Sequence, residues 1–207
     1  MSPQSLAEDL AYIRDLAEAG QKAPLLGGRF LVWWGGLTTF AYLAHYAIFE
    51  GMFGLGPTAF AVLWTGYVVA GLGGSFALHA TIGQGKPGAA STGNRVSALV
   101  WKSAGLFLGA YFTGAFLKAV TGDETFNPFI WSIPLVIGVY GLAQYVGGVI
   151  AGNRVLTLAG QAALVATVPA VLLVGSGASW LLGAAVAALC VLLPGILLMR
   201  NEPSATV

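Results

Sequence analysis

The stretch that decides the fold is residues 181–199, which read LLGAAVAALCVLLPGILLM without a single charged side chain. At a rise of ~1.5 Å per residue, about 20 such residues cross the hydrocarbon core of a bilayer as a helix. A strand of a membrane barrel would instead alternate apolar and polar side chains over about 10 residues, and this stretch does not alternate. The segment therefore predicts a transmembrane helix.

Five further apolar segments of similar length precede this one. With residues 178–199 as the last, the predicted spans are 30–49, 58–79, 96–117, 129–151 and 155–174. Charged residues make up 8% of the chain, against about a quarter in soluble domains. Because lipid offers no hydrogen-bond partner to the backbone, each span is predicted to be helical. The predicted fold class is all-α, a polytopic membrane protein with six transmembrane helices in a Gly/Ala-packed bundle, preceded by a short cytoplasmic amphipathic helix.

The sequence divides into three predicted regions. Residues 1–28 form a cytoplasmic N-terminal segment, with an amphipathic acidic helix at about 5–19. Residues 29–200 form the six-helix transmembrane domain, and residues 201–207 form a cytoplasmic tail. The loops between the spans are too short to hold a separate catalytic domain.

The distribution of basic residues predicts the orientation, because Lys and Arg collect in cytoplasmic loops. Seven of them fall on one side of a six-span arrangement, namely Arg14, Lys22, Arg29, Lys86, Arg95, Arg154 and Arg200. Only Lys118 falls near the other side, beside Glu50, Asp123 and Glu124. We therefore predict a multi-pass protein of the cell (inner) membrane with both termini in the cytoplasm.

Small residues recur four positions apart in several spans, a spacing that lets membrane helices approach closely. These stripes are Gly66/Ala70/Gly74, Gly105/Gly109, Ala162/Ala166/Ala170 and Gly183/Ala187. They predict close packing within one chain, and the use of one stripe as a contact in a homo-oligomer is the second interpretation.

Three polar side chains inside the predicted spans are the candidate binding residues, because polar groups in lipid are costly and often functional. Gln144 precedes Arg154 by ten residues and Gln161 follows it by seven, which places both amides roughly 10–15 Å inside the inner boundary. A Gln–Gln hydrogen bond would make them structural, whereas contact with a solute would make them a polar layer. Lys102 lies at a similar depth and either extends toward the interface or binds an anion.

Three prolines lie within the last three predicted spans, at positions 134, 169 and 194. Proline has no N–H, so each leaves the carbonyl four residues earlier without its helical donor. The carbonyls concerned belong to Ile130, Val165 and Cys190.

The N-terminal helix predicted at residues 5–19 has an apolar stripe on one face, formed by Leu6, Leu10, Ile13 and Ala17. The remaining face carries Glu8, Asp9, Asp15 and Glu18. An anionic leaflet would repel such an acidic helix, since interfacial membrane helices are normally basic. The stripe is therefore predicted to contact protein, either its own bundle or a cytoplasmic or membrane partner.

The chain has no motif for nucleophilic catalysis, phosphate binding or metal ligation. Its single cysteine, Cys190, excludes an internal disulfide, and its dispersed basic residues do not predict nucleic-acid binding. We therefore expect no catalytic residues, no metal and no cofactor. The leading hypothesis is a non-enzymatic integral membrane subunit or regulator that engages a partner protein through the acidic helix. The alternative is a small-solute or anion channel or transporter with a polar layer at Lys102, Gln144 and Gln161.

Overall fold

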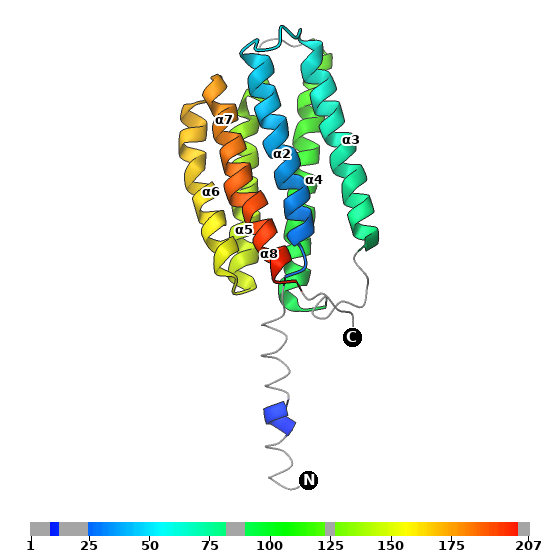
Figure 1. Ribbon diagram of the computed structural model, residues 1–207, viewed down its shortest axis with the longest axis vertical. Coiled ribbons are helices and arrows are strands. Elements are labelled where there is room, and N and C mark those ends of the chain that lie inside the picture. The colour runs from blue at the N-terminus through cyan, green and yellow to red at the C-terminus, as the bar shows by residue number, and fades with distance from the viewer. Residues whose placement is uncertain (1–8, 13–24, 82–89, 123–126, 203–207) are drawn as a thin grey trace.

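The computed structural model describes residues 9–12, 25–81, 90–122 and 127–202 (Figure 1). The main helices are α2 (Gly28–Phe49), α3 (Thr58–Thr81), α4 (Thr92–Val120), α5 (Ser132–Ile150), α6 (Arg154–Leu172), α7 (Gly177–Val186) and α8 (Leu193–Arg200). A 3-10 turn, η1 (Pro128–Trp131), precedes α5, and a π-helical segment, η2 (Ala187–Leu192), joins α7 to α8. No strand occurs in the described ranges, so the predicted all-α class is confirmed.

Within the described residues, five helical segments are long and apolar enough to span a membrane. They are Thr58–Ala80, Thr92–Val120, Pro128–Ile150, Arg154–Leu172 and Gly177–Arg200. The length and apolar composition of these helices indicate a membrane protein. The helix α2 has 22 residues and is rich in Trp, Tyr, Gly and Thr, and it is not among these five segments.

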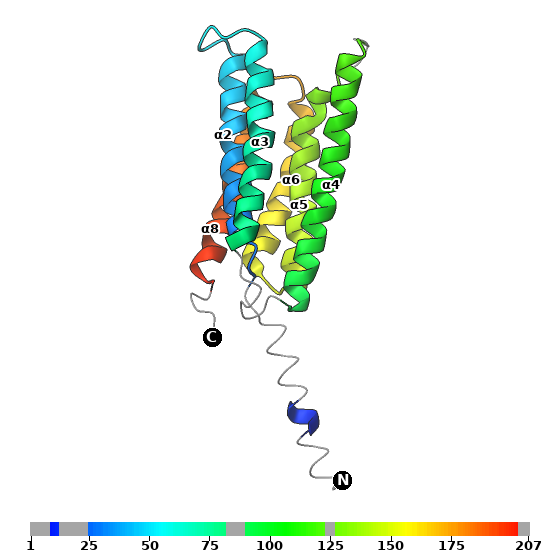
Figure 2. The same cartoon turned by 90° about the vertical axis from the view of Figure 1, so that its right-hand side faces the viewer.

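The bundle is built around two groups of helices. In the first, α2 packs on α3 and also on α7, η2 and α8. In the second, α5 and α6 form a closely packed antiparallel hairpin and α4 packs on α5. Figure 2 shows α2 and α3 side by side, with α4, α5 and α6 across from them. Contacts of α5 and α6 with α7 and η2 join the two groups around a core that includes Tyr42, Ile133, Ile137 and Val191.

Glycine allows the closest helix approaches in both groups. A Cβ on Gly35 of α2 would lie 2.6 Å from the backbone nitrogen of Leu192. A Cβ on Gly148 of α5 would lie 2.5 Å from the backbone nitrogen of Thr157 in α6. Neither position has space for a side chain, so these glycines set how near the backbones lie.

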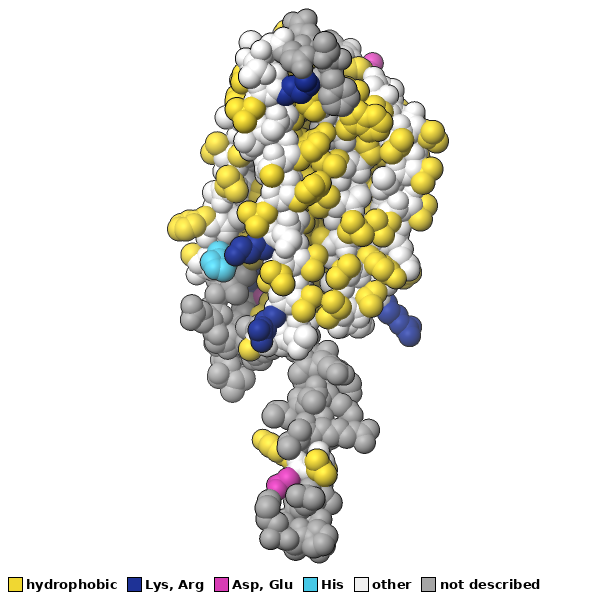
Figure 3. Space-filling model, turned by 180° about the vertical axis from the view of Figure 1, so that it is seen from behind, with side chains coloured by type: hydrophobic (Ala, Val, Ile, Leu, Met, Phe, Trp, Pro, Cys, Tyr) yellow, Lys and Arg dark blue, Asp and Glu magenta, His cyan; other side chains and the backbone are white. Residues whose placement is uncertain are grey.

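The helices α3 and α4 are much less covered than the rest of the bundle. In the most apolar 18-residue stretch of each helix, only 6% of the residues are buried. The corresponding share is 56% for Pro128–Ile150 and 50% for Gly177–Arg200. Figure 3 shows how widely apolar side chains are spread over the molecule seen from behind. The exposed large apolar residues of α3 and α4 include Val62, Val69, Leu72, Phe76, Leu99, Leu106 and Phe107. Added Cβ atoms would meet nothing at Gly66, Gly73, Gly105, Gly109 and Gly114.

The contrast between glycines predicts opposite effects of alanine. Gly148→Ala should lower the free energy of unfolding by about 1–3 kcal/mol, because its Cβ would collide with the backbone of α6. Gly105→Ala should raise it by about 0.5–1 kcal/mol, since Ala restricts the unfolded chain and meets no neighbour. Reversible unfolding of the purified chain in mixed micelles measures both changes. Equal destabilisation by the two variants would contradict this packing.

Candidate functional site

The three polar residues predicted to form one layer lie in different environments. Gln144 of α5 is 1% exposed and belongs to the core, whereas Lys102 of α4 and Gln161 of α6 are both exposed. The helices therefore direct one candidate inward and two outward, so the three side chains do not share one space.

Gln144 forms a hydrogen bond across the core to a backbone carbonyl. Its Nε2 donates to the carbonyl oxygen of Cys190 in η2. Pro194 has no N–H, so this carbonyl lacks the donor that an α-helix would supply four residues later. The side-chain amide thus gives this carbonyl a donor where the last span changes from π-helix to α-helix.

The expected Gln144–Gln161 hydrogen bond is wrong. Gln144 and Gln161 lie at similar depths along their helices, but their side chains point in different directions. Gln144 is buried and Gln161 is exposed. The Oε1 atom of Gln144 is buried without a hydrogen-bond partner among the described residues. Gln144 therefore combines a satisfied donor, bonded to Cys190, with a buried acceptor that no described residue reaches.

An aromatic cluster lies between α2, α3 and α7, toward the end of the bundle opposite the arginines. Trp64 Nε1 donates to His45 Nδ1 over 3.0 Å, and the His45 ring stacks on Trp180 with 3.4 Å between centroids. Tyr42 presents its ring at an angle to both tryptophans. Because Nδ1 accepts a hydrogen bond, the neutral imidazole carries its proton on Nε2. The cluster joins three helices around one oriented histidine.

This cluster was not predicted from the sequence. The His45 ring contacts Phe60 and Trp64 of α3 and Trp180 of α7, residues that its position on α2 does not indicate. The aromatic residues of α3 are the sequence feature that could have predicted this cluster, because Trp64 and Tyr67 lie three residues apart on the face toward α2.

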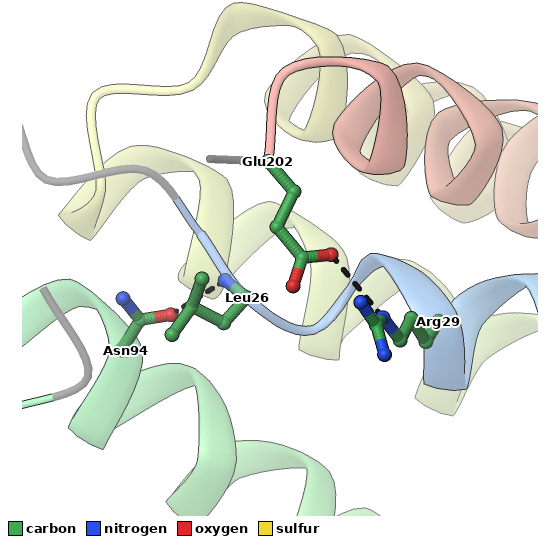
Figure 4. A network of polar contacts seen from close by, with 4 residues as sticks. All are labelled: Leu26, Arg29, Asn94 and Glu202. Carbon is green, nitrogen blue, oxygen red and sulfur yellow. Dashed lines mark hydrogen bonds and ion pairs between the residues drawn. The ribbon is translucent and has the colours of Figure 1, made fainter. Parts of the chain in front are cut away.

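A second polar network lies at the arginine-bearing end (Figure 4). The backbone N–H of Leu26, just before α2, donates to Asn94 Oδ1 at the start of α4 over 2.9 Å. Arg29 Nε lies 3.5 Å from Glu202 Oε2, and the Glu202 side chain is only 7% exposed. These contacts tie the beginning of α2 to α4 and to the segment after α8.

Of the predicted partner-binding face, only Leu10 falls within the described residues. Residues 9–12 are helical, and the Leu10 side chain is 60% exposed. Leu6, Ile13 and Ala17 lie outside the described ranges.

The described residues contain no group of three or more His, Cys, Asp or Glu that could hold a metal ion. No family model, no curated protein and no solved structure matches the chain.

The role of Gln144 can be measured with a double-mutant cycle. Gln144→Leu should lower the free energy of unfolding by about 1 kcal/mol, the range of side-chain hydrogen bonds in membrane proteins. In a Pro194→Ala background the same change should cost less than half as much, because alanine at that position restores a backbone N–H four residues after Cys190.

Gln161→Leu is the matched control, since it removes the same amide from an exposed position and should leave stability within about 0.5 kcal/mol. Unfolding in mixed micelles followed by circular dichroism supplies all values. An equal cost of Gln144→Leu in both backgrounds would show that the amide does not substitute for the donor lost at Pro194.

Proposed function

We propose that this chain is a non-enzymatic integral membrane subunit or regulator that packs against a partner protein. The observation that carries the proposal is the incomplete cover of α3 and α4. Only 6% of the residues in the most apolar 18-residue stretch of each helix are buried, whereas the share is 22–56% in the other candidate spans. Lipid covers apolar side chains well, but it gains little from exposed glycines, which in membrane helices favour close contact with another helix.

Two positions on α4 show why a protein neighbour is favoured over lipid alone. Gly105 and Gly109 are four residues apart, are exposed, and have open space where a Cβ would be. Within the described part of this chain they support no helix crossing, in contrast to Gly35 and Gly148. A partner helix placed there could approach the α4 backbone closely enough for dense van der Waals packing.

We further propose that α2 is a sixth span, so that the bundle is a six-helix membrane domain packed through Gly and Ala. Its low hydropathy is compatible with lipid because its polar atoms are bonded to α3. Trp34 Nε1 donates to Ser75 Oγ over 2.9 Å, and Thr38 Oγ1 lies 2.9 Å from Tyr67 Oη. The arginine-bearing end would face the cytoplasm of the cell, following the positive-inside rule.

The N-terminal helix predicted at residues 5–19 would give the partner a second contact on the cytoplasmic side. Support comes from Leu10, whose apolar side chain is exposed and not covered by the bundle. An acidic helix suits a protein partner better than an anionic leaflet.

The arrangement does not favour the alternative of a channel or transporter. A solute path would need Lys102, Gln144 and Gln161 to line one space, but only Gln144 lies in the core.

Site-specific photo-cross-linking in native membranes tests the proposed surface. A photoreactive residue replacing Leu106 of α4 or Val69 of α3, both largely exposed, should form an adduct with a second, different membrane protein. The matched control replaces Leu172, which is 80% exposed but lies on α6, away from the glycine stripe of α4, and should yield lipid adducts only.

Gly109→Ile in the Leu106 cross-linking variant should reduce the protein adduct at least about fivefold, because a bulky side chain blocks close helix approach. Ala162→Ile, on the exposed side of α6, should not reduce it. Adducts of twice the chain mass would identify a homo-oligomer, and lipid adducts at every position would remove the proposed protein contact. Either result would overturn the proposal.

A further inference from the structure

A shallow cleft lies at the arginine-bearing end of the α5–α6 hairpin. Its volume is about 270 Å³. It is lined by Gly148, Val149, Gly152, Arg154, Thr157 and Leu158. The cleft is therefore formed by the last turn of α5 and the first turn of α6, together with the connection between them.

The local sequence explains why the hairpin is hollowed here. Gly152 adopts a φ of +62°, which reverses the chain directly after α5. Asn153 then caps α6, with its Oδ1 accepting from the Leu156 N–H over 3.1 Å. Gly148 has no side chain, so α6 lies close behind it. The close approach at Gly148 and the open space beside Gly152, where an added Cβ would meet nothing, leave a notch at this end of the hairpin.

The lining combines one cation with apolar walls. Arg154 is exposed and pairs with no carboxylate among the described residues, because Glu202 contacts Arg29 and Glu50 lies beside Gly177 at the other end of the bundle. Val149 and Leu158 are 53% and 65% exposed and form the walls. The Thr157 hydroxyl already donates to the Asn153 carbonyl over 2.9 Å. Arg154 is therefore the one strong donor that the lining residues of the cleft offer.

We propose that this cleft binds an anionic phospholipid, with the headgroup phosphate on Arg154 and the glycerol and first acyl carbons against Val149 and Leu158. A guanidinium binds phosphate oxygens well because its planar donors match their geometry. The site lies where the α6 helix begins, at the level of the other inner arginines, which is where headgroups of a cytoplasmic leaflet would meet the protein.

The same lining argues against a free phosphate ion as the ligand. Soluble anions are held by several converging donors, whereas this cleft supplies one guanidinium and mostly apolar surface. A ligand that gains from both features must carry a negative group and an apolar part joined at one end. An anionic phospholipid has this form, whereas in phosphatidylcholine a trimethylammonium group offsets the charge of the phosphate.

Native mass spectrometry of the full chain released from detergent tests the proposal, with phosphatidylglycerol and phosphatidylcholine as probes. Wild-type protein should retain phosphatidylglycerol in preference to phosphatidylcholine. Arg154→Gln should lower the amount of phosphatidylglycerol retained by the protein about fivefold, because a basic residue near an anionic surface contributes about that factor to binding. Val149→Trp should lower the retained amount of phosphatidylglycerol to a similar extent, because the indole would fill the cleft while the charge of Arg154 stays in place.

Arg95→Gln is the matched control, since Arg95 is likewise exposed near the start of a helix at the same end but does not line this cleft. It should retain phosphatidylglycerol as wild type does. Equal loss in Arg95→Gln and Arg154→Gln would show diffuse attraction rather than a site, and unchanged retention in Val149→Trp would show that the cleft is not used. Displacement of the lipid by millimolar inorganic phosphate would identify a free anion as the ligand, and each of these results overturns the proposal.

Discussion

The structure depends on the requirement that backbone hydrogen-bonding groups be paired inside the molecule, because a hydrocarbon environment offers them no partner. Helices meet this requirement almost everywhere in the chain. The last span departs from the regular α-helical pattern, since Pro194 has no N–H and a π-helical segment precedes it. The Gln144 side chain donates a hydrogen bond to the Cys190 carbonyl. One amide on α5 therefore bonds the backbone of the helix that contains Pro194, and this contact joins the two helix groups.

Much of the fold could be predicted from composition and segment length alone. Apolar runs free of charge predicted the helical class, and five of the predicted spans match helices that are long and apolar enough to cross a bilayer. The helix α2 shows the limit of that reasoning. Its Trp, Tyr, Gly and Thr residues lower its hydropathy, yet Trp33, Trp34 and Thr38 are hydrogen-bonded to α3. A hydropathy value is a property of one segment, whereas the cost of a polar atom depends on what the neighbouring helix offers.

The candidate site was harder to predict because helical depth does not determine helical direction. Residue spacing placed Gln144 and Gln161 at similar depths, which suggested a hydrogen bond between them. Their directions differ, and the buried amide instead bonds the carbonyl that Pro194 leaves free. The sequence contained both halves of this contact, a proline that frees the Cys190 carbonyl and an amide able to reach it. Joining them required knowing that α5 packs against η2.

The uneven cover of the bundle has a physical meaning beyond its shape. In water, an apolar helix face left uncovered would drive folding or aggregation, but in lipid it costs almost nothing, so exposed Leu and Val carry little information. Exposed glycine differs, since it lowers helix propensity and offers lipid no side chain to contact. At Gly35 and Gly148 that cost is offset by close helix crossings. At Gly105 and Gly109 nothing within the described chain offsets it. The partner that we propose would offset this cost, because α4 is where a second membrane helix would gain the most from close approach.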